Sequence, residues 1–424
     1  DRDGRLGHSR SLSPSSPSLS SLVFFTRYYS SPTFAPMHTS PPAPSRTSVD
    51  DVPFPQVGQI LRHNDFDWKV ERCIYSGPFS DVFIVSESKQ RCKKYAMKVE
   101  RITGIVRPVL KLDAHVLPQL NDIAGFPQMV TSGRTANFKY CVMQLVGPDL
   151  SKLRKVMQGG KFSLATALNI GLQTLSSLEH LHNKGWLCRD VKAPNLAAGR
   201  GTDSGTIYML DFGFARRFLN ADGCTHRRRR RVAPLLGTMP YASLAAHSRK
   251  EQCPRDDVES WFYMLIEFVL GNLPWSYLPR DTMREYKNHI RKDGQEEFFA
   301  QLPSSFLKMM NCIDSTRFFD RPCYGDLRFL LNQAAAEARV NLHDPLDWVS
   351  VPSLYAKAEK LGDDVSEVPC AAEKSERSAK IKEDVRANLT ASEVDTMKER
   401  RLYGALASPS GVSLATMAAT ALWA

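Results

Sequence analysis

Leucine residues at helical spacing mark a long amphipathic segment near the middle of the chain. Ser163 is a favourable N-cap residue just before this segment and Gly185 lies just after it, so we expect a helix between them. A stripe of this kind packs into a hydrophobic core, and here it would support the loop that follows the helix. The leucines are Leu164, Leu168, Leu172, Leu175, Leu178 and Leu181.

Strands are predicted on the N-terminal side of this helix. Apolar and polar residues alternate in YAMKVE, around Lys98, which is typical of a half-buried strand. A short helix is expected among the strands. It should end near Pro118, because proline is poorly tolerated inside a helix. The predicted strands span residues 68–86, 91–101 and 138–145, and the short helix spans 109–120.

A further helix is predicted over residues 256–275, where the sequence is DDVESWFYMLIEFVLGNLPW. The segment is mostly apolar, but it is too short to cross a bilayer and it contains Glu267. We therefore expect a buried core helix, and no membrane association.

Composition changes at both ends of this patterned region. Residues 1–60 are rich in Ser and Pro and cannot bury enough apolar surface to order themselves, so a disordered segment is expected there. Residues 349–424 are charged and small, which predicts a partly helical or disordered tail. Residues 61–348 are then one large domain. The chain opens on Asp1, and Met37 is a candidate natural start.

Two short motifs carry the chemistry. They are CRDVKAPN, which ends at Asn195, and LDFG, which ends at Gly213. They place two carboxylates, Asp190 and Asp211, close in sequence to one lysine, Lys192, and to the amide of Asn195. Phosphoryl transfer needs such a set: one carboxylate accepts the proton of a hydroxyl, a lysine steadies the phosphate, and an amide and a second carboxylate hold magnesium. The alternative for the second motif is a simple turn after a strand, which Asp and Gly favour.

Longer stretches of the chain extend this pattern. QLVGPDLSKL, LCRDVKAPN, YMLDFGFARRF, GTMPYASLAAHSRKEQCPRDDVESWFYML and LPWSYL resemble the casein-kinase-1 group of protein kinases, and most of all its tau-tubulin-kinase-like branch, which is expanded in nematodes. The resemblance covers residues 66–348 and includes Ser243-Leu244-Ala245 in place of the usual Ala-Pro-Glu. It implies an α+β, bilobal protein-kinase fold with a small β-rich N-lobe and a larger helical C-lobe. It also implies ATP, Mg²⁺ and serine or threonine substrates.

The resemblance assigns roles to individual residues. Asp190 would be the catalytic base, Lys192 would contact the moving phosphate, and Asn195 and Asp211 would bind magnesium. Met143 would be the gatekeeper before a hinge, although ordinary packing explains the hinge residues equally well. The residues expected to bind ATP are Lys98, Gly77, Val82, Ala96, Met143, Gln144, Val146 and Asp113.

Two supporting residues are implied in the same way. Asp257 resembles a buried aspartate that braces the catalytic loop through backbone amides, although a carboxylate favoured by the helix dipole would look the same. The hydroxyl of Thr238, in GTMPYAS, is expected to bridge Asp190 and Lys192, as in serine/threonine kinases.

Three features of the chain depart from the family pattern. In the nucleotide-covering loop only Gly77 remains of three glycines, with Tyr75 and Ser80 at the other two places, which predicts weaker ATP binding. Asp113 stands where a glutamate would pair with Lys98. Cys188 replaces a histidine or tyrosine before the catalytic loop, and a buried, inert thiol is expected there. These departures keep a second class of function open, a pseudokinase scaffold that transfers little or no phosphate.

Charge and cysteine content bear on partners and compartment. The net charge of +11 favours acidic partners, but no RNA-binding motif or zinc finger is present, so nucleic acid is the weaker option. Nine cysteines without CxxC spacing argue against a disulfide framework or a zinc site. They favour reduced thiols in the cytoplasm or nucleus, and we expect a monomer.

A run of arginines lies inside the predicted activation segment, between Gly213 and Gly237. A generic charge run is a solvated loop, but guanidinium groups at this place would face the substrate and suit phosphate or carboxylate. We expect the run to select acidic or phospho-primed protein substrates, with a nuclear-localisation signal as the alternative. The arginines are Arg227, Arg228, Arg229, Arg230 and Arg231. Pro240 replaces an arginine that the family uses to hold the priming phosphate of the substrate.

Overall fold

The computed structural model describes residues 54–361, except 64–65, 78–79, 88–89, 103–107, 136 and 221. Of the predicted Ser/Pro-rich segment 1–60 and the predicted tail 349–424, residues 1–53 and 362–424 lie outside the described residues. The remaining chain has the α+β architecture that the sequence predicts, with strands in its first part and mainly helices in its second.

The first part is a six-stranded antiparallel sheet with the order β1-β2-β3-β4-β6-β5. The predicted strand segment 68–86 is a hairpin of β2 and β3, because the chain turns between Ser76 and Asp81. Trp68, Met97 and Val142 are among the residues that form the core of this sheet. The strands are β1 (Ile60–His63), β2 (Phe66–Ser76), β3 (Asp81–Glu87), β4 (Gln90–Arg101), β5 (Met129–Arg134) and β6 (Phe138–Gln144).

Helix α1 (Leu110–Val116) is the short helix expected among the strands. It tightens into a 3₁₀ turn over Leu117–Leu120, where Pro118 stands at the start of the turn and cannot donate a backbone hydrogen bond. Its N-terminus is tied to β4, because the Glu100 carboxylate accepts the N–H groups of Val109 and Leu110 at 2.6 and 2.9 Å. This contact fixes α1 relative to the strand that carries Lys98.

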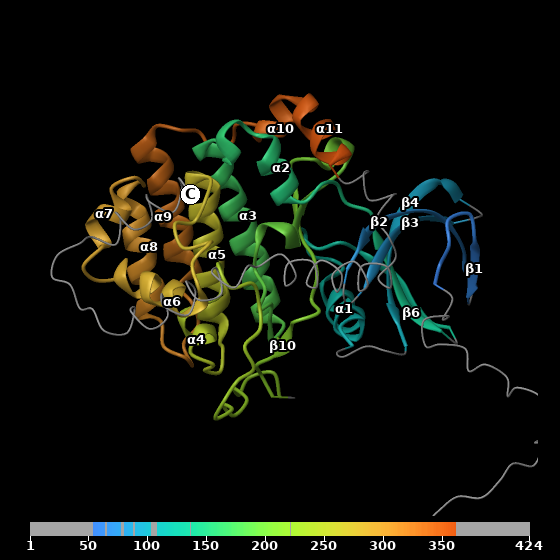
Figure 1. Ribbon diagram of the computed structural model, residues 1–424, viewed down its shortest axis with the longest axis horizontal. Helices are drawn as coiled ribbons and strands as arrows, with labels where there is room; N and C mark the ends of the chain where they lie inside the picture. Colours follow the sequence, from blue (N-terminus) through green and yellow to red (C-terminus); the bar gives the residue numbers. More distant parts are fainter. Residues whose placement is uncertain are drawn as a thin grey trace, which may run out of the picture. The chain divides into compact units, whose positions relative to one another are not determined.

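The second part is built around α3 (Leu164–Asn183), the predicted leucine helix. Ser163 caps it by accepting the N–H of Thr166 at 3.2 Å, as expected. Four of the six stripe leucines are fully buried, while Leu164 and Leu172 are half-buried at the edge of the core. In Figure 1, α3 lies beside α5 (Pro254–Leu270) and α9 (Tyr324–Ala338), and α9 lies beside α8 (Ser304–Ser315).

Helix α5 is the predicted apolar core helix, and it ends at Gly271, whose φ of 91° is left-handed. No helix in the described residues is long and apolar enough to cross a membrane. The remaining elements are α2 (Leu150–Val156), β7 (Trp186–Leu187), β8 (Leu196–Ala198), β9 (Ile207–Met209), β10 (Arg216–Arg217), α4 (Leu244–His247), α6 (Arg280–His289), α7 (Gln295–Phe299), α10 (Asp347–Ser350) and α11 (Pro352–Lys360), with 3₁₀ turns at Gln158–Gly160, Ala193–Asn195 and Gly201–Asp203.

One cysteine pair corrects the expectation that all thiols are reduced. Cys312 in α8 and Cys323 just before α9 form a disulfide, since the connection between these two packed helices brings their Cα atoms to 6.9 Å. Asp326 also lies near both sulfurs, but these are bonded to each other, so the group is not a metal site. Cys141, Cys188, Cys224 and Cys253 are not in disulfides.

Candidate active site

A cleft of about 540 Å³ lies between the sheet and the helical part, a volume suited to a nucleotide-sized ligand. The sheet contributes Val82, Ala96 and Lys98 to its walls. The predicted gatekeeper contributes Met143 and the predicted hinge contributes Gln144 and Val146. The helical part contributes Lys192, Asn195 and Asp211. The structure therefore brings together most of the residues that the sequence singled out.

Lys98 is the electrostatic centre of the cleft. Its ammonium nitrogen lies 2.8 Å from the Asp113 carboxylate and 2.9 Å from the Asp211 carboxylate. Burial alone would lower the pKa of Lys98, but the two carboxylates outweigh burial and raise it above its ordinary value. Burial alone would raise the pKa of Asp211, but the charge of Lys98 outweighs burial and holds the pKa of this carboxyl below its usual range. Both groups are charged at neutral pH.

Asp113 reaches Lys98 in spite of its short side chain. The contact of Glu100 with the first residues of α1 holds the helix against β4, and Asp113 itself is buried. Its second oxygen accepts the backbone N–H of Phe212 at 2.8 Å. One aspartate thus connects the strand lysine to the LDFG motif, and the ion pair that the sequence left in question forms.

Asp190 sits at the centre of the catalytic loop. Lys192 Nζ lies 2.8 Å from its Oδ2 atom, and Asn195 Nδ2 lies 3.2 Å from the same oxygen. The hydroxyl of Thr238 donates to Asp190 Oδ1 at 2.8 Å and accepts from Lys192 Nζ at 2.9 Å. The expected Thr238 bridge is confirmed. Asp190 is buried and, unlike Lys192, is not part of the cleft wall.

Asp257 holds the backbone of this loop. Its two carboxylate oxygens accept the backbone N–H groups of Cys188 and Arg189, each at 2.7 Å, which confirms the predicted role. His182 also contacts the Asp257 carboxylate, at 3.0 Å. The Cys188 side chain is buried, and burial raises the pKa of its thiol well above the usual value. Cys188 is therefore an inert core residue, as expected.

Two residues of the motifs have left-handed backbone conformations, Arg189 with φ of 65° and Asp211 with φ of 60°. Such conformations are costly for residues other than glycine and persist where surrounding contacts impose them. At Asp211 the conformation places a partly exposed carboxylate in the cleft, next to Lys98. Phe212 is at the same time completely buried, and its backbone N–H donates to Asp113 of α1.

The donor set fits a magnesium ion. Asp211 and Asn195 both line the cleft, and carboxylate and amide oxygens are ligands that this ion prefers. The amide nitrogen of Asn195 faces Asp190, so its oxygen is the atom suited to a cation.

The nucleotide-covering loop is partly closed by its own side chains. The ring of Tyr75 occupies the space beside Gly77, so that a Cβ atom on Gly77 would lie 2.5 Å from the Tyr75 hydroxyl. The Gly77 amide donates to the carbonyl of Ser80 at 3.1 Å instead of pointing into the cleft. Tyr75 and Ser80 line the cleft, whereas Gly77 does not.

Helix α11 is a part of the site that sequence reasoning missed. Ala358 and Glu359 belong to the cleft wall. Tyr355 donates its hydroxyl to the carbonyl of Gly199 at 2.6 Å, and Glu359 pairs with Arg200 at 3.0 Å. The Tyr355 hydroxyl also lies against Gly147, the residue after the hinge, so closely that only glycine fits there. No motif in PSLYAKAEK could have indicated this position.

The arginine run divides into two groups. Arg230 forms a bidentate contact with Glu251, which also binds Arg216 at 3.0 Å. The guanidinium group of Arg229 lies 3.7 Å from the ring centre of Phe318. The exposed arginines of the run, outside these contacts, are Arg227, Arg228 and Arg231.

Comparisons with known proteins agree with this geometry. The sequence profile of the protein kinase domain matches residues 68–327, which is more than half of the chain. The chain is 49% identical over 316 residues to the serine/threonine-protein kinase spe-6 of Caenorhabditis elegans, covering 73% of this chain and 83% of that protein. It is 36% identical over 283 residues to a probable serine/threonine-protein kinase of Dictyostelium discoideum, covering 66% of this chain and 56% of that protein. The chain therefore belongs to the protein kinase family.

Proposed function

We propose that this chain is an active serine/threonine kinase of the casein-kinase-1 group, which transfers the γ-phosphate of ATP to hydroxyl groups of proteins. The observation that carries the proposal is the contact of Thr238 with both Asp190 and Lys192. It joins the expected base, the expected phosphate-binding lysine and the end of the activation segment in one arrangement. Both relatives are named as serine/threonine-protein kinases, which supports the same substrate class.

In this proposal Asp190 accepts the proton of the substrate hydroxyl and orients its oxygen for attack. Lys192 stabilises the negative charge of the phosphoryl group as it moves, since its ammonium group lies beside Asp190. Lys98 holds the phosphates of ATP, and Asn195 and Asp211 hold magnesium. Magnesium supplies positive charge that offsets the charge developing on the transferred group.

The alternative of a pseudokinase scaffold rested on three departures from the family pattern. Two of them carry little weight, because Asp113 pairs with Lys98 and Cys188 is a buried support whose backbone binds Asp257. The third, the loop around Tyr75, bears on ATP affinity and leaves the catalytic loop as it is. The arrangement of charged groups therefore favours the enzyme.

The test is magnesium-dependent transfer of radioactive phosphate from ATP to casein and to an acidic peptide. We expect transfer by the natural chain and a loss of at least about a hundredfold in Asp190→Asn, the usual contribution of a general base. Circular dichroism establishes that both proteins are folded. Equal, background-level transfer by two folded proteins would establish the scaffold instead.

We further propose that Arg227, Arg228 and Arg231 select acidic or phospho-primed substrates. They are the exposed arginines of the run that contact neither Phe318 nor Glu251. Arg229 is also exposed but lies over the Phe318 ring, and Arg230 is bound by Glu251. A peptide with an upstream phosphoserine should be phosphorylated faster than its unmodified twin. Replacing the three exposed arginines by alanine should remove that preference, and Arg229→Ala, the matched control, should keep it. Equal rates on the two peptides by the natural chain would contradict the proposal.

A further inference from the structure

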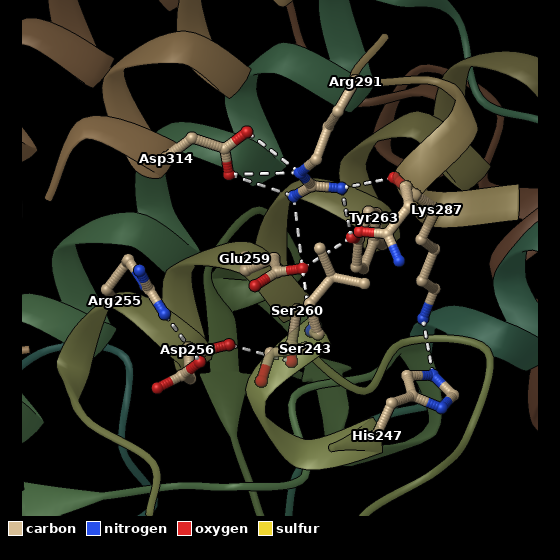
Figure 2. Close-up of polar contacts among 12 residues, drawn as sticks. Ser243, His247, Arg255, Asp256, Glu259, Ser260, Tyr263, Lys287, Arg291 and Asp314 are labelled. Carbon is tan, nitrogen blue, oxygen red and sulfur yellow. Dashed lines mark hydrogen bonds and ion pairs between the residues drawn. The ribbon is translucent and has the colours of Figure 1, made fainter. Parts of the chain in front are cut away.

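A buried lysine lies behind the turn that closes the activation segment. Lys287, in α6, is completely buried. Its ammonium group donates to the backbone carbonyls of Ala242 at 2.7 Å and Met239 at 3.2 Å, and lies 3.3 Å from Nε2 of His247. Figure 2 shows the side chain of Lys287 extending towards His247. An ammonium group has three N–H donors, so these partners satisfy all of them.

Aromatic rings complete the surroundings of this lysine. The nitrogen lies 4.4 Å from the ring centre of Tyr263 and 5.6 Å from that of Trp275, distances at which a cation is attracted to a ring face. Trp275 also donates its ring N–H to the carbonyl of Pro240 at 2.8 Å. Lys287 and Trp275 together bind three carbonyl groups of the turn over residues 238–242.

No carboxylate in the described part of the chain forms an ion pair with Lys287. The nearby carboxylate of Glu259 is instead bound by Arg291 at 3.2 Å and by the Tyr263 hydroxyl at 2.6 Å (Figure 2). Burying an ammonium group without an ion-pair partner is expensive. Carbonyl dipoles and ring faces therefore stabilise Lys287, and this arrangement links α6 to the backbone of the turn.

The first residue of this turn contacts the proposed catalytic base, Asp190. Thr238, its first residue, contacts Asp190 and Lys192, and Met239 follows directly. A displacement of the turn would therefore move both the Thr238 bridge and the surface next to the substrate hydroxyl. A shift of about 1 Å at such a place is enough to slow a reaction by a large factor.

We infer that Lys287 is a positioning residue. By fixing the turn over residues 238–242 against α6, it positions the protein substrate. The inference rests on the proposed kinase function. Loss of Lys287 should therefore affect the protein substrate and not ATP, because the cleft residues expected to bind ATP make no contact with Lys287 in the described structure.

The experiment compares Lys287→Met, which keeps the length of the side chain and removes the ammonium group, with Lys292→Met, the matched control at an exposed lysine of the same region. For Lys287→Met we expect the KM for an acidic peptide to rise about tenfold or more and the KM for ATP to change less than about twofold. Lys292→Met should leave both values unchanged. Binding of a fluorescent peptide, followed by anisotropy, should weaken in parallel for Lys287→Met alone.

A second variant covers the case in which Lys287→Met does not fold. Trp275→Phe keeps an aromatic ring and removes the N–H that binds Pro240, so it should raise the peptide KM in the same direction. An unchanged peptide KM in a folded Lys287→Met protein, or in Trp275→Phe if the former is unfolded, would overturn the inference. If the natural chain transfers no phosphate, the proposed function fails separately, and peptide anisotropy still decides the role of Lys287.

Discussion

The ammonium nitrogen of Lys98 lies 2.8 Å from Asp113, at a position where the family pattern leads one to expect the longer glutamate. The missing methylene is made up by the position of α1, whose first N–H groups bind the Glu100 carboxylate. Asp113 also accepts the N–H of Phe212, so the side chain holds two parts of the cleft at once. The departure in sequence is therefore accompanied by a matching change in packing.

Removing this carboxylate should disable the cleft. Asp113→Asn keeps the shape of the side chain but leaves Lys98 with Asp211 alone, and breaking a buried pair costs about 3–5 kcal/mol. We expect a higher KM for ATP, a lower kcat and a lower melting temperature than in the natural chain. Steady-state kinetics and thermal unfolding measure these changes. The control is Lys152→Met, which removes a charge from the cleft wall away from Lys98; an Asp113→Asn enzyme with an unchanged KM for ATP would contradict the prediction.

Restoring glycines to the nucleotide-covering loop should strengthen ATP binding. In Tyr75→Gly with Ser80→Gly, the ring beside Gly77 is gone and the backbone amides gain access to phosphate. We expect a lower dissociation constant for ATP, measured by calorimetry. Tyr75→Phe keeps the ring and should change the affinity little. An unchanged ATP affinity in the double variant would show that the loop sequence does not limit binding.

Helix α11 should contribute to nucleotide affinity although it follows the segment that matches the kinase profile. Tyr355→Phe removes the hydrogen bond to Gly199 and keeps the ring, and Glu359→Ala removes the ion pair with Arg200. Together they should loosen α11 from the hinge and raise the KM for ATP several-fold, while the KM for a peptide stays constant. Lys360→Ala, at the exposed end of the helix, is the control. Equal KM values for ATP in the natural chain, the double variant and Lys360→Ala would show that α11 does not contribute to ATP binding.

Stability should depend on pH through His247. Burial, and then the charge of Lys287, lower the pKa of His247 to about 4 from an ordinary value of 6.5. Between these values the unfolded chain binds more protons than the folded one, so the free energy of unfolding decreases as pH falls from 6.5 towards 4. The slope from one such group reaches about 1.4 kcal/mol per pH unit.

The measurement for this prediction is urea unfolding at several pH values, with His247→Gln as the comparison. Glutamine cannot gain a proton, so the variant should lose less stability over the same interval. Parallel curves for the two proteins would mean that His247 is not the titrating group.

Much of the molecule follows from local sequence. The leucine helix and its Ser163 cap, the apolar helix α5 and the strand around Lys98 all lie where periodicity and end signals predict them. The catalytic-loop residues come together because they are close in sequence, within a turn and the strand that follows it. The protein kinase family itself was predictable from these short motifs.

Other features depend on contacts between residues far apart in the chain. Examples are the bond between Tyr355 and Gly199, the stacking of Arg229 on Phe318, the Cys312–Cys323 disulfide and the burial of Lys287 behind the turn. Helical and strand periodicity report which face of an element is buried, but not which partner covers it. That partner is determined when the elements pack, because only then do distant backbone carbonyls, rings and charges come within bonding distance. The sequence by itself therefore identified the residues of the proposed reaction centre, and the tertiary structure decided what holds these residues in place.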